Sequence, residues 1–351
     1  MYTNKTTRRV NAGGLAIGGG APISIQSMLN APAHDIEGNL KQALELEAAG
    51  CDIVRVTVPD YEAVKTVEAL KNAIKIPLVA DIHFDWRMAV ESVAAGVDKV
   101  RINPGNIGDD SRVAEVARVC KSKNVPIRIG VNSGSLEKEI LKKYGAPTPE
   151  AMVESGLYHI SLLEKHDFYD IVLSLKSSDV GTMYNAYRLA AEKCPYPLHL
   201  GVTEAGTENM GVIKSAAGIG GLLLSGIGDT VRISLTDDPV KEVDAACRLL
   251  KAIGIRKGGI RFVSCPTCGR TSIDLIGIAK RAEELLADCD KDITVAIMGC
   301  VVNGPGEARE ADIGIAGGNG CGVLFKRGEI LYNKIPEEKL LDTLIEEIKK
   351  L

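Results

Sequence analysis

The sequence predicts an α/β protein in which an N-terminal (β/α)8 TIM barrel is followed by a smaller α+β domain. Runs rich in Val, Ile and Leu alternate with segments of helical period from about residue 20 to about residue 255. This alternation stops after "GIRKGG" (254–259), where a segment with a Cys-x-x-Cys pair begins. We therefore expect the barrel over residues 1–257 and the second domain over residues 258–351.

Eight short apolar runs are the expected barrel strands, and each is followed by a helix-like stretch. They lie at residues 23–28, 52–58, 77–84, 99–104, 126–132, 170–177, 197–204 and 230–236. Eight such units in about 235 residues fit a closed parallel barrel better than an open doubly wound sheet. A doubly wound sheet with fewer true strands is the alternative, although no glycine fingerprint for a dinucleotide follows the first run.

The expected second domain contains one helix near residues 273–288 and a strand over residues 292–300. Residues 320–335, "GCGVLFKRGEILYNKI", predict a hairpin that turns at "KRGE". The charged segment "PEEKLLDTLIEEIKKL" predicts a final helix. Together these elements indicate one small α+β domain.

Composition and charge exclude several classes of partner. The chain has 351 residues, with 42 Lys and Arg against 46 Asp and Glu, which gives a formal net charge of −4. This balance indicates neither nucleic acid nor an anionic membrane as a general partner. The segment "MYTNKTTRRV" lacks the apolar core of a secretory signal, and no apolar run is long enough to span a bilayer. We therefore expect a cytoplasmic protein with no membrane partner.

A repeated tripeptide places cations on the expected barrel strands. Four strands carry an arginine between two aliphatic residues and a fifth carries a lysine; these cations are Arg55, Arg101, Arg128, Arg232 and Lys176. Because side chains alternate between the two faces of a strand, the aliphatic neighbours would face the helices and the cations would face the lumen. A buried ion pair is the alternative explanation for each cation taken singly.

Few carboxylates are available to these cations. Asp81 in "ADIHF" and Glu204 in "GVTEAG" are the clear ones within the strands. An unpaired buried charge destabilises a fold by several kcal/mol, whereas a whole domain is stable by only about 5–15 kcal/mol. Because guanidinium groups match phosphate oxygens, and barrel active sites lie at the carboxyl ends of the strands, we expect a multiply charged phosphate ligand there.

Polar residues next to these strand ends are further candidates for the site. Asn103 and Asn132 follow two of the arginine-bearing strands, although loop asparagines also fix turns. His83 lies close to Asp81 in the sequence, which favours a role in the site over a purely structural one. Glu204 ends its strand and would act as a general acid if the lumen raised its pKa; an ion pair with an arginine is the alternative.

Three cysteines of the second domain are candidate metal ligands. Cys265 and Cys268 lie on a turn, and Cys300 closes the strand that follows. A structural zinc site would need a fourth cysteine or a histidine; Cys321 is the available cysteine, and no histidine occurs after His199. An iron–sulfur cluster is the other possibility, because such clusters are held mostly by cysteine thiolates.

Glu307 is a candidate fourth ligand of a different kind. It follows Cys300 across the segment "VVNGPG". A carboxylate is a harder and more exchangeable ligand than a thiolate, so it would mark the iron that a substrate oxygen can reach. A surface loop glutamate is the alternative.

Several segments together make the sequence resemble one family: "ADIHF", "VRINPGNIG", "IRIGVNSGSLE", "LHLGVTEAG", "GIGDTVRISL", "CPTCGR" and "GCVVNGPGEA". The chain resembles, from about residue 8 onward, the 4-hydroxy-3-methylbut-2-enyl diphosphate synthase family in its bacterial two-domain form. These are iron–sulfur oxidoreductases of the methylerythritol phosphate pathway of isoprenoid biosynthesis. The resemblance implies a (β/α)8 barrel and a [4Fe–4S] domain whose ligands match Cys265, Cys268, Cys300 and Glu307.

The resemblance also implies a reaction and its partners. The reaction is the reductive ring opening and dehydration of 2-C-methyl-D-erythritol 2,4-cyclodiphosphate by two one-electron transfers. Reduced ferredoxin or flavodoxin would supply the electrons. The implied assembly is a head-to-tail homodimer, in which the cluster of one subunit covers the barrel of the other.

Carried over residue by residue, the resemblance assigns roles to named side chains. The diphosphate contacts fall on Arg55, Arg101, Arg128, Lys176, Arg232 and Ser234, with Asn103, Asn132 and His83 near the substrate. Glu204 is the implied proton donor, and with Glu307, His83 and Asp81 it makes up the candidate catalytic set. The loop at residues 29–35, "LNAPAHD", departs from the threonine-rich family pattern, and no substrate contact is assigned to it.

Two other functions remain open on the sequence. One is a lyase barrel that handles a phosphate or pterin compound and carries a structural zinc domain. The other is an iron–sulfur sensor whose barrel only binds a phosphorylated effector. The first would contain zinc and no iron, and the second would contain iron but lack reductive turnover.

Overall fold

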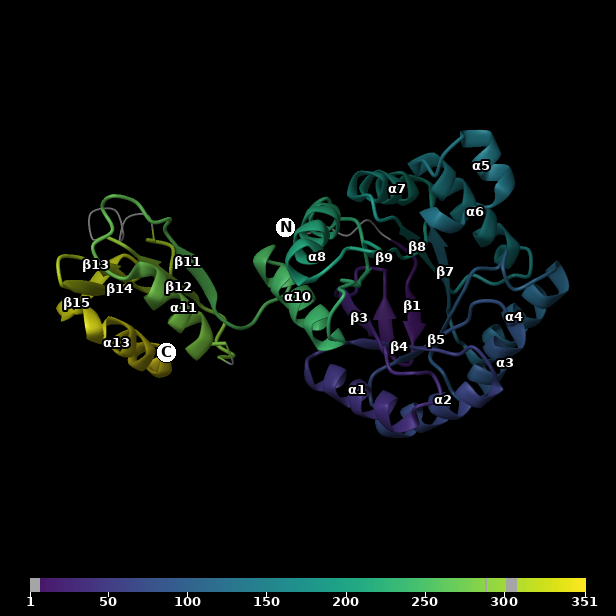
Figure 1. The fold of residues 1–351 in the computed structure, drawn as a ribbon, viewed down its shortest axis with the longest axis horizontal. Coiled ribbons are helices and arrows are strands. Elements are labelled where there is room, and N and C mark those ends of the chain that lie inside the picture. The colour runs from purple at the N-terminus through teal and green to yellow at the C-terminus, as the bar shows by residue number, and fades with distance from the viewer. Residues whose placement is uncertain (1–6, 288, 301–307) are drawn as a thin grey trace. The chain divides into compact units, whose positions relative to one another are not determined.

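The computed structural model describes residues 7–287, 289–300 and 308–351. The chain folds into two compact units that divide between Ile253 and Gly254. Figure 1 shows the first unit in purple to green and the second in green to yellow.

Eight parallel strands form the centre of the first unit. They are β3 (Ser24–Met28), β4 (Ile53–Thr57), β5 (Leu78–Asp81), β6 (Lys99–Ile102), β7 (Ile127–Asn132), β8 (Ile171–Lys176), β9 (His199–Leu200) and β10 (Thr230–Val231). They pair in the order β8-β7-β6-β5-β4-β3-β10-β9. A parallel bridge between Leu173 and Leu198 joins the two ends of this order. The predicted (β/α)8 barrel is therefore confirmed, and the open doubly wound alternative is wrong.

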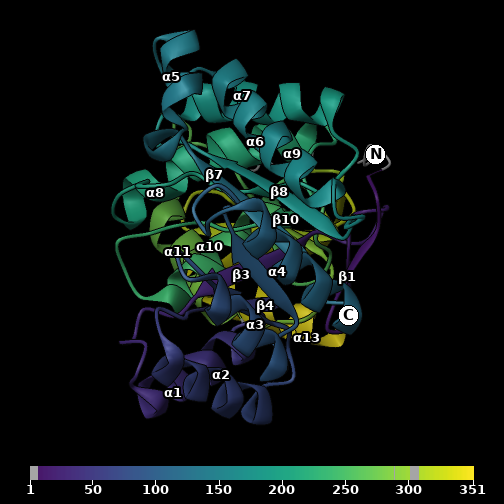
Figure 2. The ribbon, with the colours of Figure 1, turned by 90° about the vertical axis from the view of Figure 1, so that its right-hand side faces the viewer.

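Helices surround these strands, as Figures 1 and 2 show. They are α1 (Ile36–Ala48), α2 (Tyr61–Ala73), α3 (Trp86–Ala94), α4 (Asp110–Lys123), α5 (Lys138–Tyr144), α6 (Pro149–Glu164), α7 (Val180–Lys193), α8 (Glu208–Ser215), α9 (Gly221–Leu224) and α10 (Pro239–Ala252), with a 3-10 turn η1 (Ser133–Ser135) and a π-turn η2 (Ala216–Gly220). Asp35, Asp60 and Asp109 begin their helices by accepting a hydrogen bond from a backbone N–H of the first turn.

A short antiparallel hairpin, β1 (Val10–Ala12) and β2 (Leu15–Ile17), precedes the barrel. The sequence analysis did not predict it. Its apolar side chains pack against the first lumen residues of three barrel strands, and this apolar plug consists of Val10, Ala12, Ile17, Ile53, Val79 and Val172. Since Ile53 and Val79 lie two residues before Arg55 and Asp81, the plug fills the amino-terminal end of the barrel and leaves the cations toward the other end.

The second unit contains a five-stranded sheet in sequence order, β11 (Arg261–Ser264), β12 (Thr294–Met298), β13 (Ile313–Gly317), β14 (Cys321–Lys326) and β15 (Glu329–Pro336). The first three strands are parallel, and β14 and β15 form the predicted hairpin around Arg327 and Gly328. Two helices, α11 (Leu275–Leu285) and α13 (Glu337–Lys350), share one apolar core with the sheet.

Among the helices of the described residues, none combines the length and the apolar character that crossing a membrane requires.

Candidate active site

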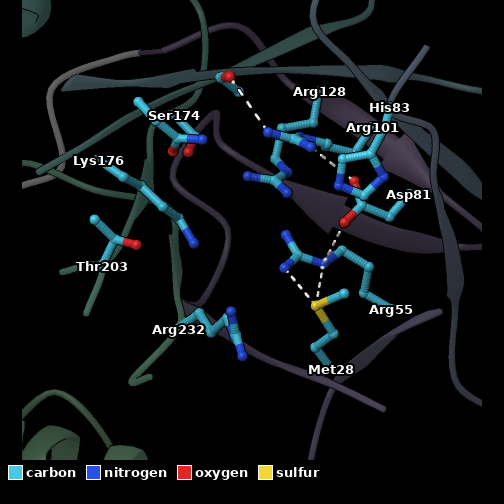
Figure 3. Close-up of a pocket in the computed structure, with 12 residues that line it drawn as sticks. Met28, Arg55, Asp81, His83, Arg101, Arg128, Ser174, Lys176, Thr203 and Arg232 are labelled. Carbon is cyan, nitrogen blue, oxygen red and sulfur yellow. Dashed lines mark hydrogen bonds and ion pairs between the residues drawn. The ribbon is translucent and has the colours of Figure 1, made fainter. Parts of the chain in front are cut away.

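A cavity of about 220 Å³ opens among the carboxyl ends of the barrel strands. It is lined by the five cations that the sequence analysis selected, namely Arg55, Arg101, Arg128, Lys176 and Arg232. Figure 3 shows these side chains turned toward a common space. We call this space, with its five cations, the cationic cavity.

Strand alternation produces this arrangement. Val54 and Val56 are buried on either side of Arg55, and Val100 and Ile102 are buried on either side of Arg101. The aliphatic side chains thus face the surrounding helices, and the arginine side chains point into the lumen. The predicted orientation of the cations is confirmed.

Asp81 holds two of these cations in place. Its carboxylate lies 3.0 Å from Arg101 Nη1 and 3.6 Å from Arg55 Nε, and all three side chains meet in Figure 3. Burial alone would raise the pKa of this carboxyl, but Arg55, Arg101 and Arg128 outweigh it and hold the pKa well below its usual range. Asp81 is therefore ionised at neutral pH, and it orients guanidinium groups rather than donating a proton.

Two further contacts in the cationic cavity involve residues that the sequence analysis missed. The Nε and Nη2 atoms of Arg55 donate to the sulfur of Met28 at 3.1 and 2.6 Å. Arg232 Nη2 lies 3.3 Å from the buried carboxylate of Glu242, which comes from α10. Nothing in the sequence pattern of α10 marks Glu242 as a partner of Arg232, because this contact depends on how the helix packs against the barrel.

Gly130 gives Arg101 the room to cross the lumen. A Cβ atom at Gly130 would lie 2.5 Å from Arg101 Nε, which is closer than real Cβ contacts allow. The carbonyl oxygen of Gly130 also accepts a hydrogen bond of 3.4 Å from Arg101 Nη2. A glycine in "IRIGVN" is thus part of how the guanidinium group is positioned.

Arg128 and Lys176 have no carboxylate within 4 Å among the residues that the structure describes. Burial lowers the pKa of both groups well below the ordinary values, and neighbouring cations lower it further. Asp81 opposes this effect at Arg128. Two buried cations without their own counter-ions favour a bound anion, because an anion would remove the electrostatic penalty that the fold leaves in place.

The other predicted site residues lie at different distances from the cationic cavity. His83 and Asn132 line it, and His83 is exposed at its mouth. Asn103 is buried in the turn after β6, where its Oδ1 accepts from the Gly105 N–H at 3.2 Å. Glu204 and Ser234 are not among the lining residues.

Glu204 has an unusual backbone conformation. It is exposed in the loop after β9 and has a φ of +52°, a left-handed conformation that non-glycine residues rarely adopt. Strained backbone conformations cluster at active sites and ligand-binding segments.

Two lining residues could have been found by the alternation rule. Ser174 lies two positions before Lys176 on β8, so it shares the lumen face. Met28 occupies the matching position at the end of β3. Neither residue was predicted, because the expectation for the strand interiors rested on their charged side chains.

The candidate cysteine ligands lie at one end of the sheet in the second unit. Cys265 directly follows β11, and Cys300 lies two residues beyond the end of β12, its parallel neighbour. The Gly299 N–H donates to Cys265 Sγ at 3.2 Å, which brings the segment just before Cys300 against the Cys-x-x-Cys turn. Cys321 begins β14, beyond β13 in the sheet order.

The thiol of Cys268 is shifted toward the thiolate form that binds iron. Hydrogen bonds from the backbone and side chain of Arg270 lower the pKa of the Cys268 thiol, and Thr271 adds to this effect. Thiolates are the form that binds iron, and N–H donors to sulfur adjust the potential of a cluster. This donor set fits an iron–sulfur cluster.

The full ligand set remains a prediction. Glu307 lies outside the described residues. Within the ranges that the structure describes, no three His, Cys, Asp or Glu side chains are gathered closely enough to hold a metal ion.

Models of two domains of one family match this chain. The GcpE TIM-barrel domain matches residues 7–247, and the GcpE protein C-terminal domain matches residues 261–350. The chain belongs to the GcpE family.

Curated relatives match the GcpE chain over nearly its whole length. A protein of Clostridium perfringens is 58% identical over 347 residues, which is 99% of both chains. A protein of Caldanaerobacter subterraneus is 56% identical over 99% of this chain and 98% of its own. Both are named 4-hydroxy-3-methylbut-2-en-1-yl diphosphate synthase (flavodoxin).

Two solved structures with a similar fold each match about seven tenths of this chain. A 3-dehydroquinate dehydratase of Geobacillus kaustophilus has a TM-score of 0.52 at 15% identity and covers 72% of this chain and 100% of its own. A dihydropteroate synthase of Yersinia pestis has a TM-score of 0.51 at 12% identity and covers 71% of this chain and 100% of its own. At such identities the likeness shows a common fold only.

Proposed function

We propose that this GcpE protein is a 4-hydroxy-3-methylbut-2-en-1-yl diphosphate synthase. It converts 2-C-methyl-D-erythritol 2,4-cyclodiphosphate to 4-hydroxy-3-methylbut-2-enyl diphosphate. Two electrons enter, the C–O bond that closes the ring breaks, and one hydroxyl oxygen leaves as water. The relatives that are more than half identical over almost the whole chain support this assignment by name. The observation that carries it is the cationic cavity.

The cavity is built to hold a diphosphate. Asp81 pairs with Arg55 and Arg101, and Glu242 pairs with Arg232. Arg128 and Lys176 therefore remain for an anionic ligand. Asp81 fixes the guanidinium groups of Arg55 and Arg101 before the ligand arrives, which reduces the reorganisation that binding requires. The substrate is held at the open, carboxyl-terminal end of the barrel, where an electron-transfer group can approach it.

The second unit supplies the ligands of the cofactor. Cys265, Cys268 and Cys300 would hold a [4Fe–4S] cluster, with Glu307 as the fourth ligand. A bound cluster would supply single-electron transfer and a Lewis-acidic iron. Arg270 favours the thiolate of Cys268, and the Gly299 N–H donates a hydrogen bond to the sulfur of Cys265.

Two exposed residues, Glu204 and His83, are proposed to act on the substrate. Glu204, presented by its left-handed backbone, is the proposed proton donor to the departing hydroxyl group. His83 lines the cavity and is placed to contact the substrate. Asn132, Asn103 and Ser234 complete the proposed substrate contacts.

Reduced flavodoxin, which the names of the relatives specify, is the proposed electron donor, and reduced ferredoxin is the alternative. The proposed location is the cytoplasm, whose reducing conditions keep the cysteines available for a cluster. The proposed assembly is a head-to-tail homodimer in which each cluster serves the barrel of the other subunit.

Anaerobic purification with iron, sulfide and zinc counted per chain is the first test. About four iron and four sulfide per chain are expected for the cluster. Turnover of the cyclodiphosphate with a one-electron reductant should then require the cluster. One zinc without iron would contradict the proposal and favour a lyase barrel, whereas an intact cluster without turnover would favour a sensor.

A further inference from the structure

Three polar side chains lie one layer below the cationic cavity, and we call Gln26, Lys99 and His199 the lower polar layer. Each is at most 1% exposed. Gln26 and Lys99 lie two residues before Met28 and Arg101, which line the cavity. Because alternate residues of a strand share a face, both point into the lumen about 7 Å deeper than the lining residues.

The polar side-chain atoms of these three residues lack hydrogen-bond partners among the described residues. Lys99 Nζ, both amide atoms of Gln26 and both ring nitrogens of His199 have no hydrogen-bond partner among the described residues. Buried polar atoms almost always have partners, and an unpaired buried charge is strongly destabilising. The lower polar layer therefore contains an amine, that of Lys99, whose charged form the fold leaves without compensation.

The charges around Lys99 are of the wrong sign for an ion pair. Burial lowers the pKa of Lys99 to about 7, and Arg128 on β7 and Arg55 on β4 contribute to the decrease. Asp81, on the neighbouring strand β5, is engaged by Arg55 and Arg101. Burial, followed by Arg128 and Lys176, lowers the pKa of His199 well below its ordinary value, so this ring is neutral at pH 7.

The apolar plug prevents Lys99 from finding a counter-ion below. Lys99 pairs in register with Val79, which belongs to the plug together with Ile53. The cationic cavity is thus the direction from which a negative charge can compensate Lys99. In a low-dielectric lumen, a charge acts strongly over several ångströms without direct contact.

We propose that Lys99 is a further anion-recognition residue of the barrel, whose charge is compensated by a phosphate-class anion bound in the cationic cavity. The inference rests on the proposed function in one respect, since it takes that anion to be the diphosphate of the substrate. Gln26 and His199 supply neutral dipoles in the same layer, which can orient toward the Lys99 ammonium group. Arg128, which lies between Lys99 and the cavity opening, shares the same compensation.

A purely structural lysine behaves differently, and the same region of the chain provides one. Lys71 Nζ lies 2.5 Å from Asp98 Oδ2, and Asp98 directly precedes Lys99. Lys71 is paired within the protein, so its removal should weaken the fold without affecting a ligand. It is the matched control.

The test uses the full chain and inorganic pyrophosphate as the probe. Lys99→Met, Lys99→Gln and Lys71→Met are compared with the parent protein by calorimetric titration of pyrophosphate and by thermal unfolding without ligand. Both Lys99 variants should bind pyrophosphate on the order of tenfold more weakly. Lys99→Met should also unfold at a higher temperature, because it removes an uncompensated buried charge.

Lys71→Met should show the opposite result, with a lower unfolding temperature and an affinity unchanged within about twofold. Unchanged affinity in both Lys99 variants would overturn the inference. So would a lower unfolding temperature of Lys99→Met, since that would mean that the ammonium group stabilises the fold itself. Pyrophosphate binding requires no electron transfer, so failure of the inference is distinguishable from absence of turnover of the cyclodiphosphate, which bears on the proposed function.

Discussion

Glu242 Oε1 lies 3.3 Å from Nη2 of Arg232, although one residue belongs to helix α10 and the other directly follows strand β10. The same carboxylate accepts hydrogen bonds from Ser27 Oγ at 2.9 Å and from the Leu235 N–H at 3.0 Å. One buried side chain thus fixes a cavity cation, a neighbouring strand and the following loop together. Glu242 therefore couples the packing of α10 to the orientation of the Arg232 side chain.

Glu242→Gln should raise the KM for the cyclodiphosphate more than it lowers kcat. The amide keeps the size of the side chain but removes the charge that orients Arg232. We expect a loss of about 1–3 kcal/mol in unfolding free energy, because a buried charge-assisted contact is replaced by a weaker one. Chemical denaturation and steady-state kinetics measure the two effects. Asp244→Asn on the exposed face of the same helix is the control, and it should change stability by less than about 1 kcal/mol.

Asp81→Asn should be less stable than the parent protein at neutral pH, by about 3 kcal/mol or more. The pKa of Asp81 is held below its usual range in the folded chain, so its stabilising effect is complete above the unfolded-state value of about 3.9 and is lost as the pH falls. The parent protein should therefore lose stability on acidification below about pH 4 more steeply than the variant. Equal slopes in denaturation series at several pH values would contradict this role.

Gly130→Ala should weaken pyrophosphate binding without any change of charge. The added methyl group would meet Arg101 Nε at 2.5 Å and force the guanidinium group away from Asp81. Titration of pyrophosphate measures the effect, which we expect to be on the order of tenfold. Gly134→Ala, where a Cβ meets no atom within 4 Å, is the control and should bind normally.

The effect of Lys99 on stability should depend on pH. The pKa of Lys99 is lowered to about 7 in the folded chain from an ordinary value near 10.5. Between these two pH values the unfolded chain therefore binds more protons than the folded chain. Stability of the parent protein should therefore rise with pH through this interval, and the advantage of Lys99→Met should be largest below about pH 7 and shrink toward pH 10. Unfolding temperatures of the parent protein and of Lys99→Met, measured from pH 6 to pH 10, test this dependence. A difference between the two proteins that stayed constant over this range would contradict it.

Two inactive variants should restore activity when mixed, if each cluster serves the other subunit's barrel. Arg128→Met disables a cavity, and Cys300→Ser disables a cluster site. Random exchange of subunits should then recover about a quarter of the parent activity, because half of the dimers carry one complete site. Turnover after co-refolding or co-expression measures this, and no recovery despite mixed dimers would contradict the head-to-tail assembly.

Much of the barrel was predictable because it depends on local patterns. The eight apolar runs coincide with β3 to β10, and the aliphatic-Arg-aliphatic tripeptides fixed which face each cation takes. The hairpin β14–β15 was predictable from "KRGE", where Arg327 and Gly328 adopt the positive φ values that a tight turn needs. The β1–β2 hairpin was missed because strands of three residues are too short to show a period.

The residues missed in the site depend on contacts between distant segments. Lys99 is the first residue of its strand, a position that in sequence suggests a solvated strand end, whereas in the structure it is fully buried. Glu242 belongs to a helix whose pattern indicates a surface helix, and barrel closure brings its carboxylate to Arg232. The roles of Glu204, Ser234 and Glu307 stay predictions, because they concern a substrate and a cofactor.

The apolar plug also has a kinetic consequence. Because Val10, Ala12 and Ile17 fill the amino-terminal end of the barrel, the field of the lumen cations is directed toward the cavity at the carboxyl ends of the strands. Protein of low dielectric constant around the cavity concentrates the electric field at its opening. An approaching dianion is therefore steered to this opening before it touches the protein. Capture of the substrate should thus be fastest in dilute buffer and slow as salt is added, even though the chain as a whole is negatively charged.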